Sequence, residues 1–109
     1  SRYIQEAHSI YTVVETEVAK YKATDDPSDD DINNYIKDIL SGNTIATADN
    51  NQLKGIIAKK TELDDVDVER NGNTYKMYWI SDDDHRIEAT LTKNKDVKIV
   101  STDSNHNFD

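Results

Sequence analysis

The spacing of apolar side chains divides the chain into a helical part and a strand part. Over residues 1–23, apolar positions recur every three or four residues, which is the pattern of one face of an α-helix. The stripe predicts one long amphipathic helix that packs on a globular core. Tyr3 and Ile10 widen the stripe. The predicted helix–sheet core positions are Ile4, Ala7, Tyr11, Val14, Val18 and Tyr21. No start signal is seen, because the apolar pattern follows Ser1 and Arg2 at once, without an acidic first turn.

An acidic segment ends this helix and starts the next one. Residues 24–31 read TDDPSDDD, where Pro27 lacks an N–H and five aspartates favour turns and helix caps. A second helix is predicted over 29–41, with Ser28 or Asp29 as its N-cap.

Two glycines shape the rest of the helix-to-sheet loop, which spans residues 24–62. Gly42 is expected to end the second helix in the left-handed conformation. A third short helix is predicted around 50–60, although Gly55 in its interior disfavours it by about 1 kcal/mol.

From residue 63 the apolar period changes from 3.6 to 2, which is typical of strands. Asn71-Gly72 is a strong signal for a two-residue hairpin turn. Residues 63–101 therefore predict an antiparallel meander, and residues 102–109 a polar tail in which Phe108 packs back on the domain. The four predicted strands are 66–70, 73–80, 86–92 and 97–101.

Length and composition place all of this in one small domain, residues 1–109. Only 35% of the residues are hydrophobic and 32% are charged, so the core must be thin. We therefore predict an α+β fold in which the long N-terminal helix packs on a four-stranded antiparallel meander sheet, with short helices in the connecting loop.

The charge and the absence of cysteine exclude several functions. The net charge of −9 disfavours nucleic acid and anionic membrane surfaces as ligands, because both require clustered Lys and Arg. A chain without cysteine has no disulfide, thiol nucleophile or thiolate metal site. No apolar run approaches the length of a membrane span.

The sequence predicts no catalytic residue, cofactor or metal site. His8, His85 and His106 are isolated, without a second histidine at metal-ligand spacing. Ser9 does not face His8, because neighbouring side chains on a helix point about 100° apart. We therefore predict that the protein is not an enzyme.

Two acidic runs could contribute oxygens to calcium, but neither matches an EF-hand loop. Asp82, Asp83 and Asp84 are interpreted as a solvated turn. The alternation over residues 64–69 is interpreted as a strand with an acidic outer face.

The order of elements and the text of the first helix resemble the type IV pilins. The stretch YIQEAHSIYTVVETEVAKYKA is similar to the C-terminal half of the pilin helix, which faces the sheet before the chain enters the helix-to-sheet loop. In the order of its elements the resemblance covers the whole chain. In amino-acid sequence it covers about the first 23 residues.

The resemblance implies a structural subunit of a type IV pilus filament, extracellular on the bacterial surface, with roles in adhesion or motility. It implies that the family's hydrophobic half-helix, cleavage site and early glutamate lie upstream of Ser1, so that Glu6 is not that glutamate. The implied partners are further copies, other pilins and the pilus assembly machinery, with membrane contact only through the upstream segment. Many pilins have a C-terminal disulfide; its absence here is more typical of pilins from Gram-positive anaerobes.

A possible filament contact also follows from the helix without the family. A head-to-tail contact repeated with a fixed rotation makes an open filament. One flank beside the apolar stripe combines mixed charge with a single valine, which suits a side-by-side contact, although a merely solvated flank is the alternative. The filament-interface candidates on it are Arg2, Glu6, Val13, Glu17 and Lys20.

Two other functions remain open at this point. A soluble acidic binding module, such as an inhibitor that mimics nucleic-acid charge, could use residues 25–31 and 82–84. A coiled-coil dimer through the first helix is a structural rival, although three heptads are about the minimum for that interpretation.

Overall fold

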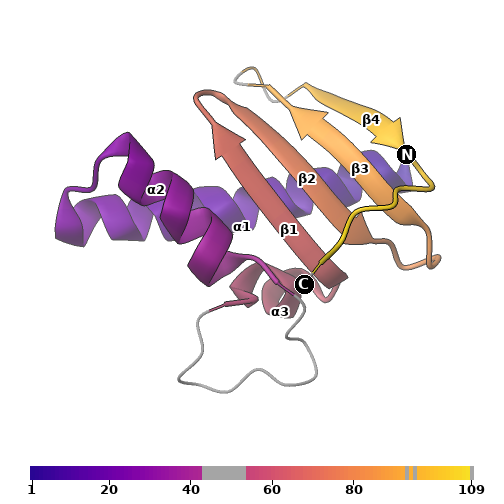
Figure 1. Cartoon of the computed structure of the whole chain (residues 1–109), viewed down its shortest axis with the longest axis horizontal. Coiled ribbons are helices and arrows are strands. Elements are labelled where there is room, and N and C mark those ends of the chain that lie inside the picture. Colours follow the sequence, from indigo (N-terminus) through magenta and orange to yellow (C-terminus); the bar gives the residue numbers. More distant parts are fainter. Residues whose placement is uncertain (43–53, 93, 95, 109) are drawn as a thin grey trace.

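A computed structural model describes residues 1–42, 54–92, 94 and 96–108. The molecule measures 37 × 33 × 21 Å. Helix α1, Arg2–Asp25, runs along its longest dimension (Figure 1). The Ser1 hydroxyl accepts a hydrogen bond from the Ile4 N–H at 3.4 Å, so α1 has the N-cap that the sequence analysis missed. Asp26 in the left-handed conformation ends the helix.

The sheet is a four-stranded antiparallel meander in the order β1-β2-β3-β4. This arrangement confirms the α+β prediction of a long N-terminal helix and a four-stranded antiparallel sheet. Gly72, with φ 62, forms the predicted turn between the first two strands. The strands are β1 Asp64–Asn71, β2 Thr74–Ile80, β3 Arg86–Leu91 and β4 Val97–Ser101.

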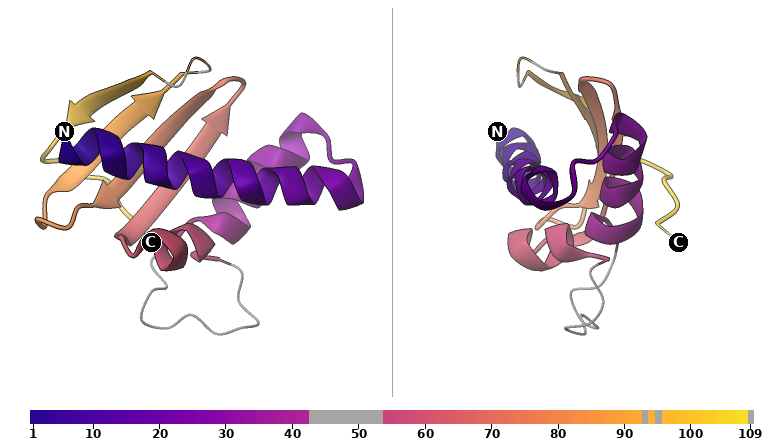
Figure 2. Two further views of the ribbon diagram at one scale, coloured as in Figure 1. Left: turned by 180° about the vertical axis from the view of Figure 1, so that it is seen from behind. Right: turned by 90° about the vertical axis from the view of Figure 1, so that its left-hand side faces the viewer.

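Helix α1 lies across one face of the sheet, as the view from behind shows (Figure 2), and core residues from both fill the space between them. Ala7, Ile10 and Val14 are fully buried on the helix side, and Met77 and Trp79 on the sheet side. These side chains alternate along β2 and recur at helical spacing on α1, so both sequence periods point at the same core.

One predicted core position is wrong. Ile4 is 37% exposed, because it lies about 80° around the helix from the centre of the buried stripe. Ala7, Val14 and Val18 are buried as predicted, whereas Tyr11 and Tyr21 are half-buried and pack against the edge of the core.

The second predicted helix forms but its last turn is unusual. Helix α2, Asp29–Tyr35, starts at a capping box in which Ser28 and Asp31 bond each other's backbone N–H groups. It continues into a π-helix, η1, Ile36–Leu40, which closes with Ser41 N–H donating to the Ile36 carbonyl at 3.1 Å.

Gly42 does not act as the predicted left-handed helix stop. Its φ is 129°, and its N–H donates to the Val66 carbonyl at 2.6 Å. The Ser41 hydroxyl accepts from the Val68 N–H at 3.0 Å in the same region. The helix therefore ends where its chain joins the edge of β1.

Helix α3 spans Ile56–Thr61, and the part of the third predicted helix before residue 54 lies outside the described residues. Gly55 is its N-cap with φ 90 rather than an interior residue, so the predicted helix penalty does not arise. After β4, residues 102–108 cross the face of the sheet opposite α1 (Figures 1 and 2).

Candidate functional site

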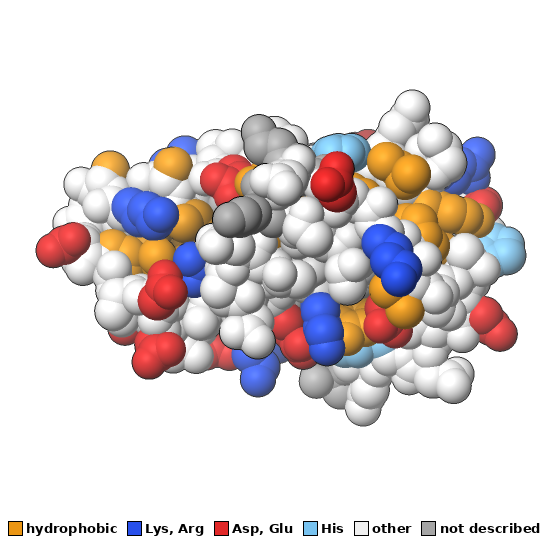
Figure 3. Space-filling view, turned by 90° about the horizontal axis from the view of Figure 1, so that it is seen from above, with side chains coloured by type: hydrophobic (Ala, Val, Ile, Leu, Met, Phe, Trp, Pro, Cys, Tyr) orange, Lys and Arg blue, Asp and Glu red, His pale blue; other side chains and the backbone are white. Residues whose placement is uncertain are grey.

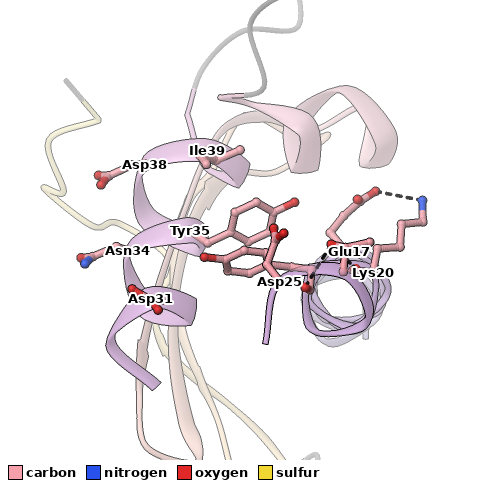
Figure 4. Close-up of a pocket in the computed structure, with 10 residues that line it drawn as sticks. Glu17, Lys20, Asp25, Asp31, Asn34, Tyr35, Asp38 and Ile39 are labelled. Carbon is pink, nitrogen blue, oxygen red and sulfur yellow. Dashed lines mark hydrogen bonds and ion pairs between the residues drawn. The ribbon is translucent and has the colours of Figure 1, made fainter. Parts of the chain in front are cut away.

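A cleft of about 600 Å³ lies between the C-terminal half of α1 and the α2–η1 helix (Figure 4). Its volume falls in the range of ligand-binding pockets. Carboxylates outnumber cations around it, and π-helical turns such as η1 often occur at functional sites. The lining residues are Glu17, Lys20, Tyr21, Thr24, Asp25, Asp31, Asn34, Tyr35, Asp38 and Ile39.

Two tyrosines form the centre of this cleft. Tyr35 from α2 is labelled in Figure 4, and its ring stacks on that of Tyr21 from α1 at 4.5 Å between centroids and 27° between planes. Burial raises the pKa of Tyr21, and the charges of Asp31 and Asp25 raise it further. Burial likewise raises the pKa of Tyr35, with a contribution from Glu17. The negative charge around the cleft thus reaches both rings.

Glu17 is not on a free flank of α1, contrary to the sequence prediction. It is only 7% exposed, pairs with Lys60 from α3, and lies 3.6 Å from the Lys20 ammonium. Because α3 covers it, Glu17 ties α1 to the short helix.

Glu6, the second acidic interface candidate, is also buried, at 9% exposure. Its carboxylate accepts from Trp79 Nε1 at 2.9 Å and from the Asp82 N–H at 3.3 Å. A buried charge needs such partners, because desolvation without them is costly. Glu6 therefore joins α1 to the centre of the sheet and to the β2–β3 loop.

The remaining interface candidates lie in different surroundings. Arg2 is exposed and lies 3.6 Å from Asp83, Lys20 is exposed, and Val13 is half-buried against the core. The five residues therefore do not form one exposed patch, because the helix turns Glu6 and Glu17 toward the domain.

The side of α1 that faces away from the sheet carries a feature that the sequence analysis missed. At about 100° per residue, its exposed positions lie within a sector of about 80° opposite the buried stripe. They recur at spacings of four and three and carry no charge, in a chain with 32% charged residues. That absence of charge was the available signal. The residues of this outer stripe are Gln5, Ser9, Thr12, Thr16, Ala19 and Ala23.

Two hydroxyl groups of the outer stripe are already satisfied within the helix. Thr12 Oγ1 donates to the His8 carbonyl at 2.9 Å, and Thr16 Oγ1 donates to the Thr12 carbonyl at 2.9 Å. Covering these two residues with another surface would therefore leave neither hydroxyl donor unpaired.

The tail is held on the outer face of the sheet by Arg86. Its guanidinium donates to the Ser104 carbonyl at 3.0 Å and to the His106 carbonyl at 2.6 Å, and lies 5.2 Å from the Phe108 ring. Phe108 thus packs back as predicted.

His106 adds a second anchor for the same tail. Its ring stacks on Tyr78 at 3.7 Å and 6°, and its Nε2 lies 2.8 Å from Asp67 Oδ2. Contacts to side chains of β1, β2 and β3 thus hold the C-terminal segment without a disulfide.

The acidic runs weighed as calcium sites are engaged or solvated. Asp83 accepts from the Tyr3 hydroxyl at 2.7 Å, and this bond lowers the Asp83 pKa. Among the described residues, no three His, Asp or Glu side chains cluster as a metal site would require. His8 and His85 are exposed and lie on different elements.

The two acidic clusters considered for an acidic binding module, residues 25–31 and 82–84, lie at opposite ends of the molecule. Asp83 contacts Tyr3 at the start of α1, whereas Asp25 is its last residue, about 33 Å away at 1.5 Å per residue. On the face shown in Figure 3, acidic and basic side chains are interspersed, with a group of hydrophobic side chains toward each end. The clusters therefore do not form one continuous acidic row.

Comparisons with protein-family models, with curated proteins and with solved structures find no match to this chain. In the described parts of the chain, no helix has the length and apolarity to cross a bilayer.

Proposed function

We propose that this domain is the sheet-bearing part of a filament subunit of the type IV pilin kind. The architecture is compatible with the proposal, because one long helix lies along a single antiparallel meander sheet (Figure 2). It carries with it a location on the bacterial surface, a membrane-anchored state before assembly, and a non-enzymatic role.

The observation that carries the proposal is the uncharged outer stripe of α1. The sheet covers the opposite side of the helix, so this stripe is the part of α1 that lies farthest from the sheet and is accessible to another subunit. Apart from Gln5, its side chains are short and allow close approach, and contact there does not bury an unpaired charge.

The outer stripe also explains how a chain of net charge −9 could associate with itself. Long-range repulsion between copies is screened beyond about 8–10 Å at physiological salt. At the contact itself the stripe adds no like charges, because the charged residues of α1 flank it. Arg2 and Lys20 lie on one flank, and Glu15 and Lys22 on the other.

In this arrangement α1 faces the filament interior and the sheet faces outward. The outer sheet face and its tail, residues 102–108, would then be the surface that meets the environment. The proposal takes this contact to be heterologous, with the stripe of one copy meeting a different surface of the next, because contacts of that kind generate open helical assemblies.

The test is a single charge placed on the outer stripe of the full-length protein in its native cell. Ala19→Lys is expected to reduce the number of filaments seen by electron microscopy at least tenfold, because it would bury an ammonium at the contact. Asn73→Lys adds the same charge in the exposed β1–β2 turn and is the matched control.

Both variants should unfold at the wild-type temperature, because both sites are exposed. Wild-type filament numbers in Ala19→Lys cells would overturn the proposal. An equal loss in both variants would also count against it, because the effect would then follow charge and not position.

A further inference from the structure

The cleft between α1 and α2–η1 has the chemistry of a binding site for a cationic side chain. Four carboxylates and one ammonium line it, which gives a formal charge of −3. Two stacked tyrosines lie between the carboxylates of α1 and those of α2–η1 (Figure 4). A group that fits both features has an apolar stem to cover the rings and a positive end to meet the carboxylates.

We infer that this cleft binds a lysine- or arginine-bearing segment of a partner protein. Aromatic faces attract ammonium and guanidinium groups, most strongly when the cation is partly desolvated. The aliphatic stems of Lys and Arg pack on apolar surface while their charged ends stay in polar surroundings. The inference goes beyond the filament proposal and does not depend on it.

The four carboxylates of the cleft differ in whether they already have a hydrogen-bond or ion-pair partner. Glu17 is already paired with Lys60 and Lys20, and Asp31 accepts from the Ser28 N–H in the capping box. Asp25 and Asp38 are exposed, and no ion pair of either is found among the described residues. Asp25 belongs to the α1 wall of the cleft and Asp38 to the η1 wall, so each can meet a different basic side chain of one bound segment.

The size of the cleft and the charge of the chain decide the source of the cation. About 600 Å³ is the volume of a site for a drug-sized ligand, which is more than one side chain fills. A peptide segment uses that space, whereas a free amine would leave most of it to water. A basic partner is favoured over a second copy at this cleft because, unlike the outer stripe, the cleft is itself negatively charged. A second copy would bring 22 Asp and Glu against 13 Lys and Arg to it.

The experiment titrates the chain with tetralysine and with tetra-acetyl-lysine in low salt. Acetylation removes the charge and keeps the aliphatic stem, so only tetralysine should bind. Changes in the ring resonances of Tyr21 and Tyr35 in nuclear magnetic resonance spectra report contact at the cleft.

A pair of double variants then locates the binding. Asp25→Asn with Asp38→Asn is expected to weaken tetralysine binding about fivefold, the effect of losing two exposed charge contacts. Glu69→Gln with Glu88→Gln removes the same net charge from the outer sheet face and should bind as wild type does. Both pairs lie on the surface, and their circular dichroism should match the wild type.

Three results would overturn the inference. Equal weakening in the two double variants would show a general attraction to an acidic chain, and equal binding of the acetylated peptide would show that charge is not recognised. Self-association of the chain that is lost on changing Asp25 and Asp38 would replace the basic partner with a second copy.

Discussion

The indole N–H of Trp79 donates to Glu6 Oε1 at 2.9 Å, and this bond joins the centre of the sheet to the first turns of α1. The other oxygen of the same carboxylate accepts from the Asp82 N–H at 3.3 Å. One buried acid on the helix thus positions both β2 and the loop that follows it.

Replacing Glu6 is expected to destabilise the fold. Glu6→Ala removes the acceptor of two donors, one of them the buried Trp79 indole, which should lower the free energy of unfolding by about 1–3 kcal/mol. Urea unfolding measures the change. Gln5→Ala at the exposed neighbouring position is the control and should stay within about 0.5 kcal/mol. Equal values for the two variants would show that the buried bond contributes nothing.

The Arg86 contacts predict that the C-terminal segment can be released without unfolding the sheet. Arg86→Lys keeps the charge but loses the planar fork that reaches the Ser104 and His106 carbonyls together. Carboxypeptidase should then remove residues from the tail severalfold faster than in the wild type. Lys76→Ala on the same sheet face should leave the rate unchanged. A wild-type rate in Arg86→Lys would mean that the His106 stack holds the tail alone.

Gly42 and Gly72 should respond differently to substitution. At Gly42, with φ 129, an added Cβ would approach the Lys54 side chain to 3.0 Å, whereas at Gly72, with φ 62, the space is open. Gly42→Ala is therefore expected to cost about 1–3 kcal/mol of stability, measured by urea unfolding. Gly72→Asn should cost less than about 0.5 kcal/mol, because Asn tolerates the left-handed conformation. The reverse order would contradict the backbone assignment.

The raised pKa of Tyr11 predicts how the free energy of unfolding changes at alkaline pH. Burial raises the pKa of Tyr11 to about 12, with a hydrogen bond to Glu15 adding to the shift. The folded state thus holds this proton more tightly than the unfolded state, whose tyrosine pKa is about 10. The Tyr11 contribution is fully present below pH 10 and is lost as pH rises through about 12.

Tyr11→Phe tests this prediction, because it keeps the ring that packs edge-on against Tyr75 at 5.6 Å. The difference between the unfolding free energies of wild type and variant, measured by urea unfolding from pH 9 to 12, should shift against the wild type as pH rises. A constant difference would show that Tyr11 ionises alike in both states.

Much of the secondary structure follows from local sequence. The switch from a period of 3.6 to a period of 2 near residue 63 separates the helical part from the sheet, as the structure confirms. Ser28 caps α2 and Asn71-Gly72 turns the first hairpin, because these signals act over two to four residues.

The tertiary structure decided what each face of α1 meets. Glu6 and Trp79 are 73 residues apart in the chain, so no local pattern could show that this acid is buried. Glu17 is covered by Lys60 of α3, which lies 43 residues later in the sequence. The flank predicted to be free is therefore partly internal, and the uncharged outer stripe stands in its place.

The π-helical turn has the same kind of cause. The chain leaves η1 where Ser41 and Gly42 bond Val68 and Val66 of β1, and these partners come more than 20 residues later. The sequence by itself determined the long first helix, the four strands and their order, because hydrophobic period and turn chemistry are local. Only the tertiary structure decided the buried acids, the partners that anchor the tail and the cleft, because each depends on pairing between distant segments.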